Sequence, residues 1–381
     1  MRLGVPLILS MSLLLGCQPS PRKAAIVSHS PARTPSGEVV FKKGENGVHT
    51  YRIPAITRTR SGVLLAFAEA RHNSGSDTGD IDLVLKRSVD GGKTWSDMIT
   101  IWDDGSNVCG NPSPVVDRRT GKIILLATWN DGRDHEPDIH KRTSLDTRRV
   151  FRIFSEDEGL TWSEPVEITD QTKLPEWTWY ATGPSHAVQL PSGRIIVPCN
   201  HGNFGSESTS HVIYSDDGGE TWAIGGETHV GNECTLARLP GGKLMLNMRK
   251  TDPERKQYGN GRLVAVSLDE GLSFEKPYYD ASLTEPVCNA SLINGSPLRP
   301  SNTLFFSNPE HPSKRVNLTL RMSRDAGRNW KRVATLTEGP AAYSDLVIMR
   351  NKDVGVLYEA GETNPYEAIY FARLRRKDLN K

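Results

Sequence analysis

Ser88-Val89-Asp90-Gly91-Gly92-Lys93-Thr94-Trp95 is the stretch that decides the fold, because the chain repeats its pattern. The copies read Ser-x-Asp-x-Gly-x-Thr-Trp, with two looser endings, and begin at Ser88, Ser155, Ser215, Ser267 and Ser323. Their starts lie 67, 60, 52 and 56 residues apart, as in an array of similar structural units. In each copy Ser and Asp suit a tight turn, Gly allows a positive φ, and the aromatic residue packs into the adjacent core. The pattern therefore predicts a repeat fold.

The intervals between the copies predict antiparallel strands. Most hold two short apolar, β-branched runs split by a turn that contains glycine, such as 187–190 and 194–197 around Gly193. No stretch keeps a helical period over three turns. Six such hairpins predict an all-β fold, a six-bladed β-propeller with four strands per blade. The last unit lacks its own aspartate turn, and Val39–Phe41 is expected to supply its missing strand.

Composition is that of one ordinary globular domain. Of 381 residues, 36% are hydrophobic and 24% charged, and the net charge is only +2. A charge this small, with no basic run carrying interleaved aromatics, argues against nucleic acid as a partner. We expect residues 38–381 to form the propeller, which leaves little room for a second domain.

The N-terminal segment predicts export. Arg2 precedes an apolar run, 3–15, that is too short to span a bilayer and has the size of a signal-peptide core. The run ends in Leu14-Leu15-Gly16-Cys17, similar to the lipobox of bacterial lipoproteins, in which the cysteine carries the lipid. We therefore expect residues 1–17 to be a lipoprotein signal, 18–37 a flexible tether, and the protein to be membrane-anchored, facing the periplasm or the cell surface. An ordinary secretory signal is the alternative.

The other four cysteines leave two possibilities open. They are Cys109, Cys199, Cys234 and Cys288, and they form either disulfides or buried free thiols. None has the C-x-x-C spacing of a metal site. The acidic residues recur in the turns rather than in an oxygen cage, so we expect no metal.

The segment Tyr51-Arg52-Ile53-Pro54 ahead of a set of aspartate turns resembles the exo-α-sialidases, or neuraminidases, of the bacterial Asp-box (BNR-repeat) family. The resemblance covers about residues 39–374. It implies a sialidase-like propeller that hydrolyses terminal α-linked sialic acids from glycoproteins, oligosaccharides or glycolipids, with no cofactor. The turn aspartates themselves are expected to be structural.

The resemblance implies three arginines that bind the carboxylate of sialic acid. Arg52, Arg249 and Arg315 match them in order and in local sequence. Planar, permanently charged guanidinium groups bind a carboxylate better than lysine does. Glu359, in Leu357-Tyr358-Glu359, matches the glutamate that pairs with the first arginine and orients it.

The resemblance also implies a tyrosine nucleophile. A carboxylate that approached the anomeric carbon, which itself bears a carboxylate, would meet like charge, and sialidases are an exception to the two-carboxylate rule of glycosidases. Tyr343 matches this nucleophile, and Glu233 matches the base that takes its proton. The base is needed because a phenol has an ordinary pKa near 10.

The general acid is expected in the Gly/Ser-rich stretch 71–80. Asp77 matches it, although Asp80 and Asp82 compete on chemistry alone. An acid that works near neutral pH needs a raised pKa. Arg71 is expected to contact the C4 hydroxyl or the carboxylate region of the sugar, and Asn130 and Asp131 its C4 hydroxyl and N-acyl group.

Two other functions are compatible with these residues. The first is a propeller that binds sialic acid without catalysis, although binding requires only the arginines. The second is a trans-sialidase, or a hydrolase of a related nonulosonic acid. An acceptor site near Trp177, Trp179 and Tyr180 would separate these functions.

Overall fold

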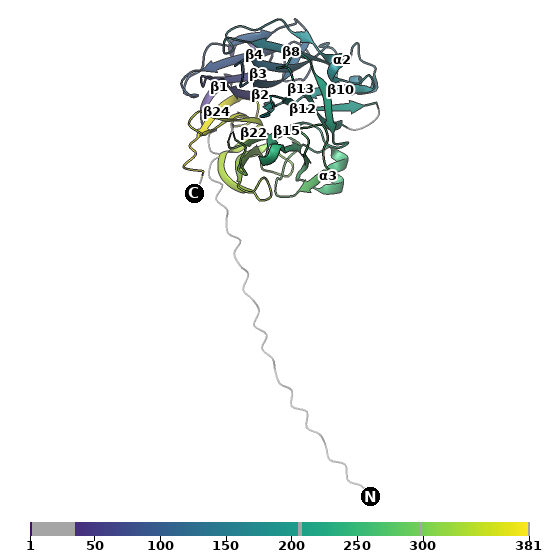
Figure 1. The fold of residues 1–381 in the computed structure, drawn as a ribbon, viewed down its shortest axis with the longest axis vertical. Helices are drawn as coiled ribbons and strands as arrows, with labels where there is room; N and C mark the ends of the chain where they lie inside the picture. Colours follow the sequence, from purple (N-terminus) through teal and green to yellow (C-terminus); the bar gives the residue numbers. More distant parts are fainter. Residues whose placement is uncertain (2–34, 205–207, 297–298, 380–381) are drawn as a thin grey trace. The chain divides into compact units, whose positions relative to one another are not determined.

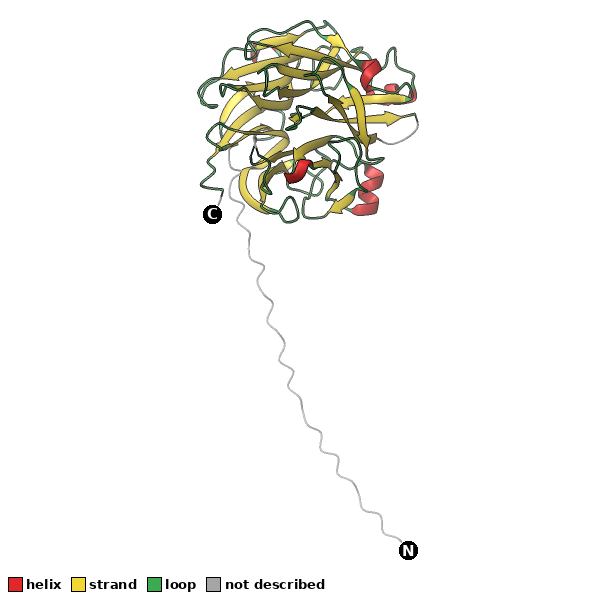
Figure 2. Cartoon of the chain, viewed as in Figure 1, coloured by secondary structure: helices red, strands yellow, loops and turns green. Residues whose placement is uncertain are grey.

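The computed structural model describes residue 1 and residues 35–204, 208–296 and 299–379. Residues 35–379 belong to one compact unit, which is built almost wholly from antiparallel strands (Figures 1 and 2). The predicted signal peptide, Cys17 and most of the predicted tether lie outside the described residues. Within them, no helix is long and apolar enough to cross a membrane. The prediction of an all-β fold is confirmed.

The first of four sheets contains eight strands. They are β2 (Thr50–Arg58), β3 (Leu64–Arg71), β4 (Ile81–Ser88), β5 (Ile99–Trp102), β6 (Val108–Val116), β7 (Ile123–Asn130), β8 (Arg149–Ser155) and β9 (Val166–Glu167). All neighbours run antiparallel except β4 and β6, which share one parallel bridge at Ile81 and Val108. That bridge joins β2–β5 to β6–β9, so two consecutive repeats share one sheet.

The next two sheets each correspond to one repeat. One contains β10 (Trp177–Thr182), β11 (Val188–Gln189), β12 (Ile195–Asn203), β13 (Ser208–Ser215) and β14 (Ala223–Glu227). The other contains β15 (Cys234–Arg238), β16 (Leu244–Met248), β17 (Arg262–Ser267) and β18 (Tyr278–Asp280).

The last sheet joins the two ends of the described unit. It contains β19 (Ser291–Asn294), β20 (Leu304–Pro309), β21 (Val316–Ser323), β22 (Lys331–Ile348), β23 (Val354–Ala360), β24 (Ala368–Leu374) and β1 (Glu38–Lys42). The first half of β22 pairs with β21 and its second half with β23. β1 pairs with β24, with Val39 opposite Tyr370, which confirms that Val39–Phe41 completes the last unit.

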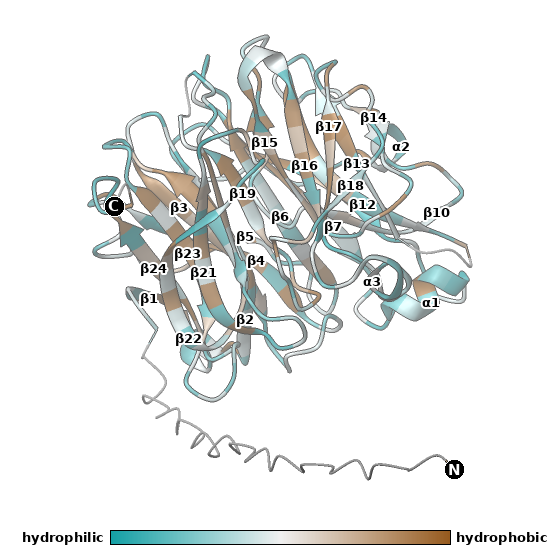
Figure 3. Ribbon diagram, turned by 90° about the horizontal axis from the view of Figure 1, so that it is seen from below, coloured by the Kyte–Doolittle hydropathy of each residue, from teal (hydrophilic) through white to brown (hydrophobic). Residues whose placement is uncertain are grey.

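Helices are few and short among the described residues. They are α1 (Glu136–Lys141), α2 (Thr169–Thr172), α3 (Asp252–Tyr258), and the 3-10 turns η1 (Glu45–Gly47) and η2 (Pro240–Gly242). Figure 3 shows apolar residues concentrated on the strands and polar residues on the connecting loops.

The five aspartate turns have the hydrogen bonds that their sequence predicts. In the second copy Ser155 Oγ donates to Asp157 Oδ1 (2.9 Å), and Asp157 accepts from the Thr161 amide (2.9 Å). The glycine of the pattern adopts a positive φ in every copy, and at Gly92 a Cβ would lie 2.0 Å from the Phe371 ring. The turns therefore stabilise the connections between successive strands.

The aromatic residue of each turn fills the core between its own sheet and the preceding unit. Trp162, for example, meets the Phe67 ring edge-on at 5.8 Å between centroids. Trp95, Trp222, Phe274 and Trp330 pack in the equivalent clusters. These clusters bury both faces of the strands, so the strands read as continuous apolar runs rather than alternating ones.

The four cysteines of the described unit form no disulfides. Cys109, Cys199, Cys234 and Cys288 are all buried and unpaired, so they are free thiols.

Candidate active site

A polar cavity of about 240 Å³ lies where strands from different sheets converge. Figure 1 shows β2, β12, β15 and β22 together in the middle of the unit, and packing joins β2 to β22 and β12 to β15. Seven of the predicted catalytic and substrate-binding residues line this cavity: Arg52, Arg71, Asp77, Glu233, Arg249, Arg315 and Tyr343. Contacts between segments up to about 300 residues apart therefore assemble the site.

Glu359 forms an ion pair with Arg52, the first of the three arginines. It lies on β23 with no exposed surface, and its Oε1 accepts from Arg52 Nε at 2.8 Å. Burial acts to lower the pKa of Arg52, but the Glu359 carboxylate together with Tyr366 and Tyr343 outweighs it and raises that pKa. Arg52 is therefore a fixed cation: its NH2 also donates to Glu359, to Oε2 at 3.4 Å, and the side chain lines the cavity. The predicted orienting role of Glu359 agrees with this contact.

The Glu359 carboxylate also stabilises the strained backbone of Ile53. Ile53 has a φ of 57°, a left-handed conformation that is costly for a β-branched residue. Its amide donates to Glu359 Oε1 (2.9 Å), while the Tyr343 amide donates to Glu359 Oε2 (3.0 Å). One buried carboxylate thus fixes the position of Arg52, Ile53 and Tyr343 together.

Arg249 and Arg315 complete the group of three arginines. Arg249 follows β16, and its NH1 contacts Glu233 Oε2 at 2.6 Å. Arg315 precedes β21, and its NH1 donates to the Tyr366 hydroxyl at 2.7 Å. The guanidinium of Arg315 lies 5.3 Å from the centre of the Tyr343 ring, and that of Arg52 lies 5.2 Å from it. Three cations therefore surround one phenol, where an anionic ligand would bind.

Tyr343 and Glu233 form a direct hydrogen-bonded pair in the cavity lining. The Tyr343 hydroxyl donates to Glu233 Oε1 at 2.5 Å and accepts from Arg249 NH1 at 3.2 Å. Burial, followed by the Glu233 carboxylate, raises the pKa of Tyr343 well above its ordinary value. The phenol is therefore protonated at rest, and Glu233 is placed to accept its proton when the oxygen attacks.

Asp77 lies at the tip of the hairpin between β3 and β4. Its Oδ1 contacts Arg71 NH1 at 2.6 Å, and its side chain is 76% exposed. Desolvation acts to raise the pKa of Asp77, but the charges of Arg71 and Arg52 outweigh it and lower that pKa. A raised pKa was expected for the general acid; in the free protein the pKa of Asp77 is lowered instead, because Arg71 pairs with the carboxylate.

Comparison with known proteins agrees with this geometry. Residues 62–356 match the model of the BNR repeat-like domain. An exo-alpha-sialidase of Aspergillus fumigatus is 31% identical over 86% of this chain and 84% of its own length, and a sialidase of Bacteroides fragilis is 30% identical over 93% and 68%. The solved structure of the Hadza microbial sialidase Hz136 superposes with a TM-score of 0.78 at 30% identity, covering 90% of this chain and 68% of that one. The chain belongs to the BNR-repeat sialidase family.

Two predicted sugar contacts of this sialidase-family chain lie outside the cavity lining. Asn130 is buried, and its Oδ1 accepts from Arg148 NH1 at 2.6 Å. Asp131 pairs instead with Arg133 at 2.7 Å. The structure therefore places Asn130 as a support for Arg148 and does not bring Asp131 to the cavity.

The competing acids Asp80 and Asp82 are also absent from the cavity lining, which leaves Asp77 as the aspartate there. Of the predicted acceptor-site aromatics, Trp179 lines the cavity, while Trp177 and Tyr180 are buried.

Sequence reasoning missed a group of residues beside Arg71. Glu69 Oε2 contacts Arg71 NH2 at 2.6 Å, and Glu69 Oε1 accepts from the Asn111 amide at 2.9 Å. Arg148 also lines the cavity, stacks 4.1 Å from the centre of the Trp179 ring, and has a pKa lowered to about 10 by burial. Glu69 and Arg71 are two residues apart on β3, so their side chains point to the same face of the strand. This spacing was the sequence signal from which their pairing could have been predicted.

Proposed function

We propose that this chain is an exo-α-sialidase, which hydrolyses terminal α-linked sialic acids of glycoproteins, oligosaccharides or glycolipids with retention of configuration. The observation that carries the proposal is the Tyr343–Glu233 hydrogen bond of 2.5 Å beneath Arg52, Arg249 and Arg315. A site that only bound an anionic sugar would need the arginines but not a phenol paired with a base. Family membership supports the same reaction.

Binding rests on the three arginines. The carboxylate of sialic acid would bind between Arg52, Arg249 and Arg315, whose guanidinium groups already converge on the Tyr343 ring. In this binding mode the anomeric carbon, which bears the carboxylate, would lie next to the Tyr343 oxygen. Arg71, Arg148 and Trp179 also line the cavity and would contact the sugar substituents.

The first half of the reaction forms a bond from the Tyr343 oxygen to the anomeric carbon. The phenolic proton passes to Glu233, and Asp77 gives a proton to the glycosidic oxygen as its bond to the sugar breaks. In the second half Asp77, now a carboxylate, takes a proton from water, and the water oxygen attacks the anomeric carbon. The bond to Tyr343 breaks, and Glu233 returns the proton to the phenol. Two inversions give net retention.

Asp77 must change its surroundings before it can act as the acid. In the free protein Arg71 holds it as a carboxylate. A bound substrate would add a negative charge at the arginines and cover the exposed Asp77 side chain. Both changes favour the protonated carboxyl. Substrate binding therefore prepares the acid.

Hydrolysis of a fluorogenic α-glycoside of N-acetylneuraminic acid tests the proposal, with Tyr343→Phe beside the wild type. We expect loss of about three orders of magnitude or more in turnover, because the phenyl ring stays but the nucleophilic oxygen is gone. Tyr214→Phe, outside the cavity, is the matched control. No turnover by the wild type, with sialic acid still bound, would favour the binding propeller instead.

We also propose that the four sheets contain six four-stranded blades. The sets are β2–β5, β6–β9, β10–β14, β15–β18, β19–β21 with the first half of β22, and the rest of β22 with β23, β24 and β1. β10 and β11 both pair with β12, as two pieces of one innermost strand would. An experimental structure viewed down the proposed axis would test this count.

For residues 1–37 we propose the lipoprotein signal and tether, with 38–381 as the catalytic domain and Cys17 as the lipid-bearing residue. The support is the sequence alone. Expression of the chain and of Cys17→Ser, followed by fractionation and intact mass, tests it. Membrane-bound wild type with added acyl mass and a released, unmodified variant are the expected results. A wild type that is soluble and unacylated would contradict it.

A further inference from the structure

Three potential metal ligands lie together at the base of the hairpin that carries Asp77. His72 follows β3, Asp80 precedes β4, and Asp82 lies on β4. One ligand atom from each residue lies within 4.8 Å of the others. The His72 amide also donates to the Asp80 carbonyl at 3.0 Å, so the backbone holds the two sides of the hairpin together.

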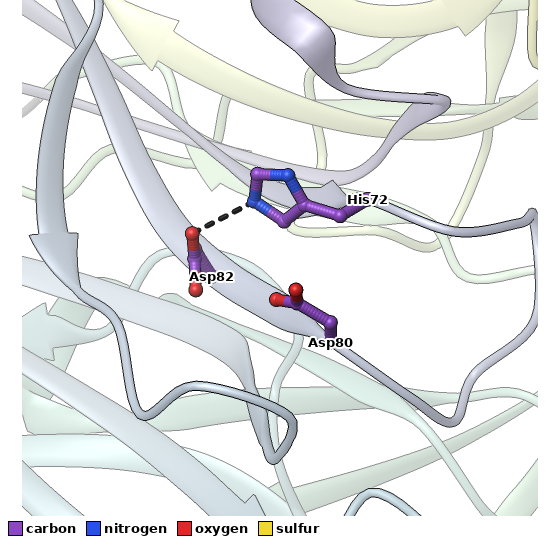
Figure 4. A group of neighbouring side chains, drawn as sticks. All are labelled: His72, Asp80 and Asp82. Carbon is purple, nitrogen blue, oxygen red and sulfur yellow. Dashed lines mark hydrogen bonds and ion pairs between the residues drawn. The ribbon is translucent and has the colours of Figure 1, made fainter.

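The Asp82 carboxylate is buried and only half satisfied. Its side chain is 8% exposed, and Oδ2 meets His72 Nε2 at 2.8 Å. Oδ1 is buried and has no hydrogen-bond donor. Figure 4 shows the Asp82 carboxylate facing the His72 ring, with the Asp80 carboxylate beside the pair. A buried carboxylate oxygen without a donor is costly, and a cation would satisfy it.

The other charges nearby do not supply this cation. Asp103 and Asp80 add negative charge around Asp82. The closest arginine along the hairpin, Arg71, contacts Glu69 and Asp77 instead. The neighbourhood thus holds more acids than bases, and His72 is the basic group that faces Asp82.

We propose that His72, Asp80 and Asp82 bind a divalent first-row transition metal ion such as Zn²⁺. One imidazole nitrogen with two carboxylates is a donor set that suits this class, whereas Ca²⁺ and Mg²⁺ favour sites built from oxygen alone. Metal–ligand bonds of about 2.0–2.2 Å require the three ligand atoms to lie closer together than the present limit of 4.8 Å. Rotation of Asp80 would close that gap, while the ion replaces the proton shared by His72 and Asp82.

Such an ion would tie β3 to β4 immediately below Asp77. It would lie outside the cavity lining, so it takes no part in the chemical steps proposed above. Its role would be to fix the base of the hairpin. The proposal departs from the expectation that no metal binds, which considered the acids of the turns and not this cluster.

Calorimetric titration of ZnCl₂ into the tag-free, chelator-stripped full chain tests the site. We expect about one Zn²⁺ per chain, and a loss of affinity of at least about tenfold in both His72→Gln and Asp80→Asn. These two side chains are partly exposed, so their replacement leaves the fold intact even if Asp82→Asn does not fold. Co²⁺ in place of Zn²⁺ should give visible absorption that both variants lose.

His229→Gln is the matched control. His229 also lies near an acid, 3.5 Å from Glu227, but its side chain is 83% exposed. This variant should bind Zn²⁺ as the wild type does. Absence of stoichiometric binding, or equal affinity in His72→Gln, Asp80→Asn and His229→Gln, would overturn the proposal.

Discussion

Tyr343 donates a hydrogen bond of 2.5 Å to Glu233, although β22 and the segment before β15 are 110 residues apart in the chain. Arg249 NH1 contacts both side chains, at 3.2 Å from the Tyr343 hydroxyl and 2.6 Å from Glu233. The base is therefore held on the phenol before any substrate arrives, and a cation stands beside the oxygen on which charge develops. Such preorganisation is a main source of enzymatic rate enhancement.

Glu233→Gln should lower kcat/KM by about 10²–10⁴-fold, because the amide keeps the hydrogen bond to Tyr343 but accepts a proton poorly. The melting temperature should change little. Kinetics with the fluorogenic glycoside and a thermal melt measure both. Glu275→Gln, at an exposed glutamate outside the cavity, is the control. Wild-type kinetics in Glu233→Gln would remove Glu233 from the role of base.

Asp77→Ala should lose about 10²–10⁴-fold of activity on natural sialylated glycans but less than about tenfold on an aryl glycoside. A phenolate leaving group departs without a proton, so the second substrate does not need the acid. Parallel assays of the two substrates give the ratio. Asp97→Asn, an exposed aspartate elsewhere, should lower neither. Equal losses on both substrates would contradict the assignment of Asp77.

Glu359→Gln should reduce the free energy of unfolding by about 3–5 kcal/mol, because it leaves Arg52 as a buried cation without its partner. It should also raise KM, since Arg52 and the strained Ile53 backbone lose the carboxylate that positions them. Urea unfolding and steady-state kinetics measure the two effects. Glu362→Gln, at a nearby exposed glutamate, is the control. A variant as stable as the wild type would show that Glu359 is dispensable.

The second aspartate turn should contribute stability that acid removes. Desolvation acts to raise the pKa of Asp157, but hydrogen bonds led by that from Thr161 lower it to about 2. A lowered pKa stabilises the folded state above the unfolded value, near 4, and that stability disappears as the pH falls through about 2. Asp157→Ala should therefore be less stable by about 1–2 kcal/mol at pH 7, with a difference that shrinks between pH 4 and pH 2.

Urea unfolding of both proteins across that pH range checks this prediction. Asp97→Ala provides a control at an exposed aspartate outside the turns. A difference between Asp157→Ala and the wild type that stays constant down to pH 2 would show that the ionised carboxylate is not the source.

The sequence predicted the fold class because the aspartate turns are local. The hydrogen bonds that the turn aspartate makes with the serine and threonine of its own copy lie within five residues, so their pattern and their structure coincide. The pairing of β1 with β24 was also predictable, because the last repeat lacked one strand. The division into sheets was not, since one parallel bridge between Ile81 and Val108, and the continuous strand β22, join neighbouring repeats.

The site was predicted where the resemblance gave residue-by-residue matches, and missed where partners are brought together only by folding. Arg148 has no local motif, and it reaches the cavity through hydrogen bonds to Asn130 and Thr128. The lowered pKa of Asp77 depends on where the Arg71 side chain lies, which spacing along the chain does not reveal. Trp177 was expected near an acceptor site, but it is stacked on His201 inside the core.

Covalent trapping tests the central claim, a tyrosine nucleophile, most directly. A 2,3-difluoro sialic acid carries a good leaving group at C2, while fluorine at C3 destabilises the positive charge of both transition states. We expect the glycosyl-enzyme to accumulate, with intact mass showing one sugar and peptide mapping placing it on Tyr343. An adduct on another side chain would contradict the account, and so would a wild type that stays unmodified while it hydrolyses the fluorogenic substrate with inversion.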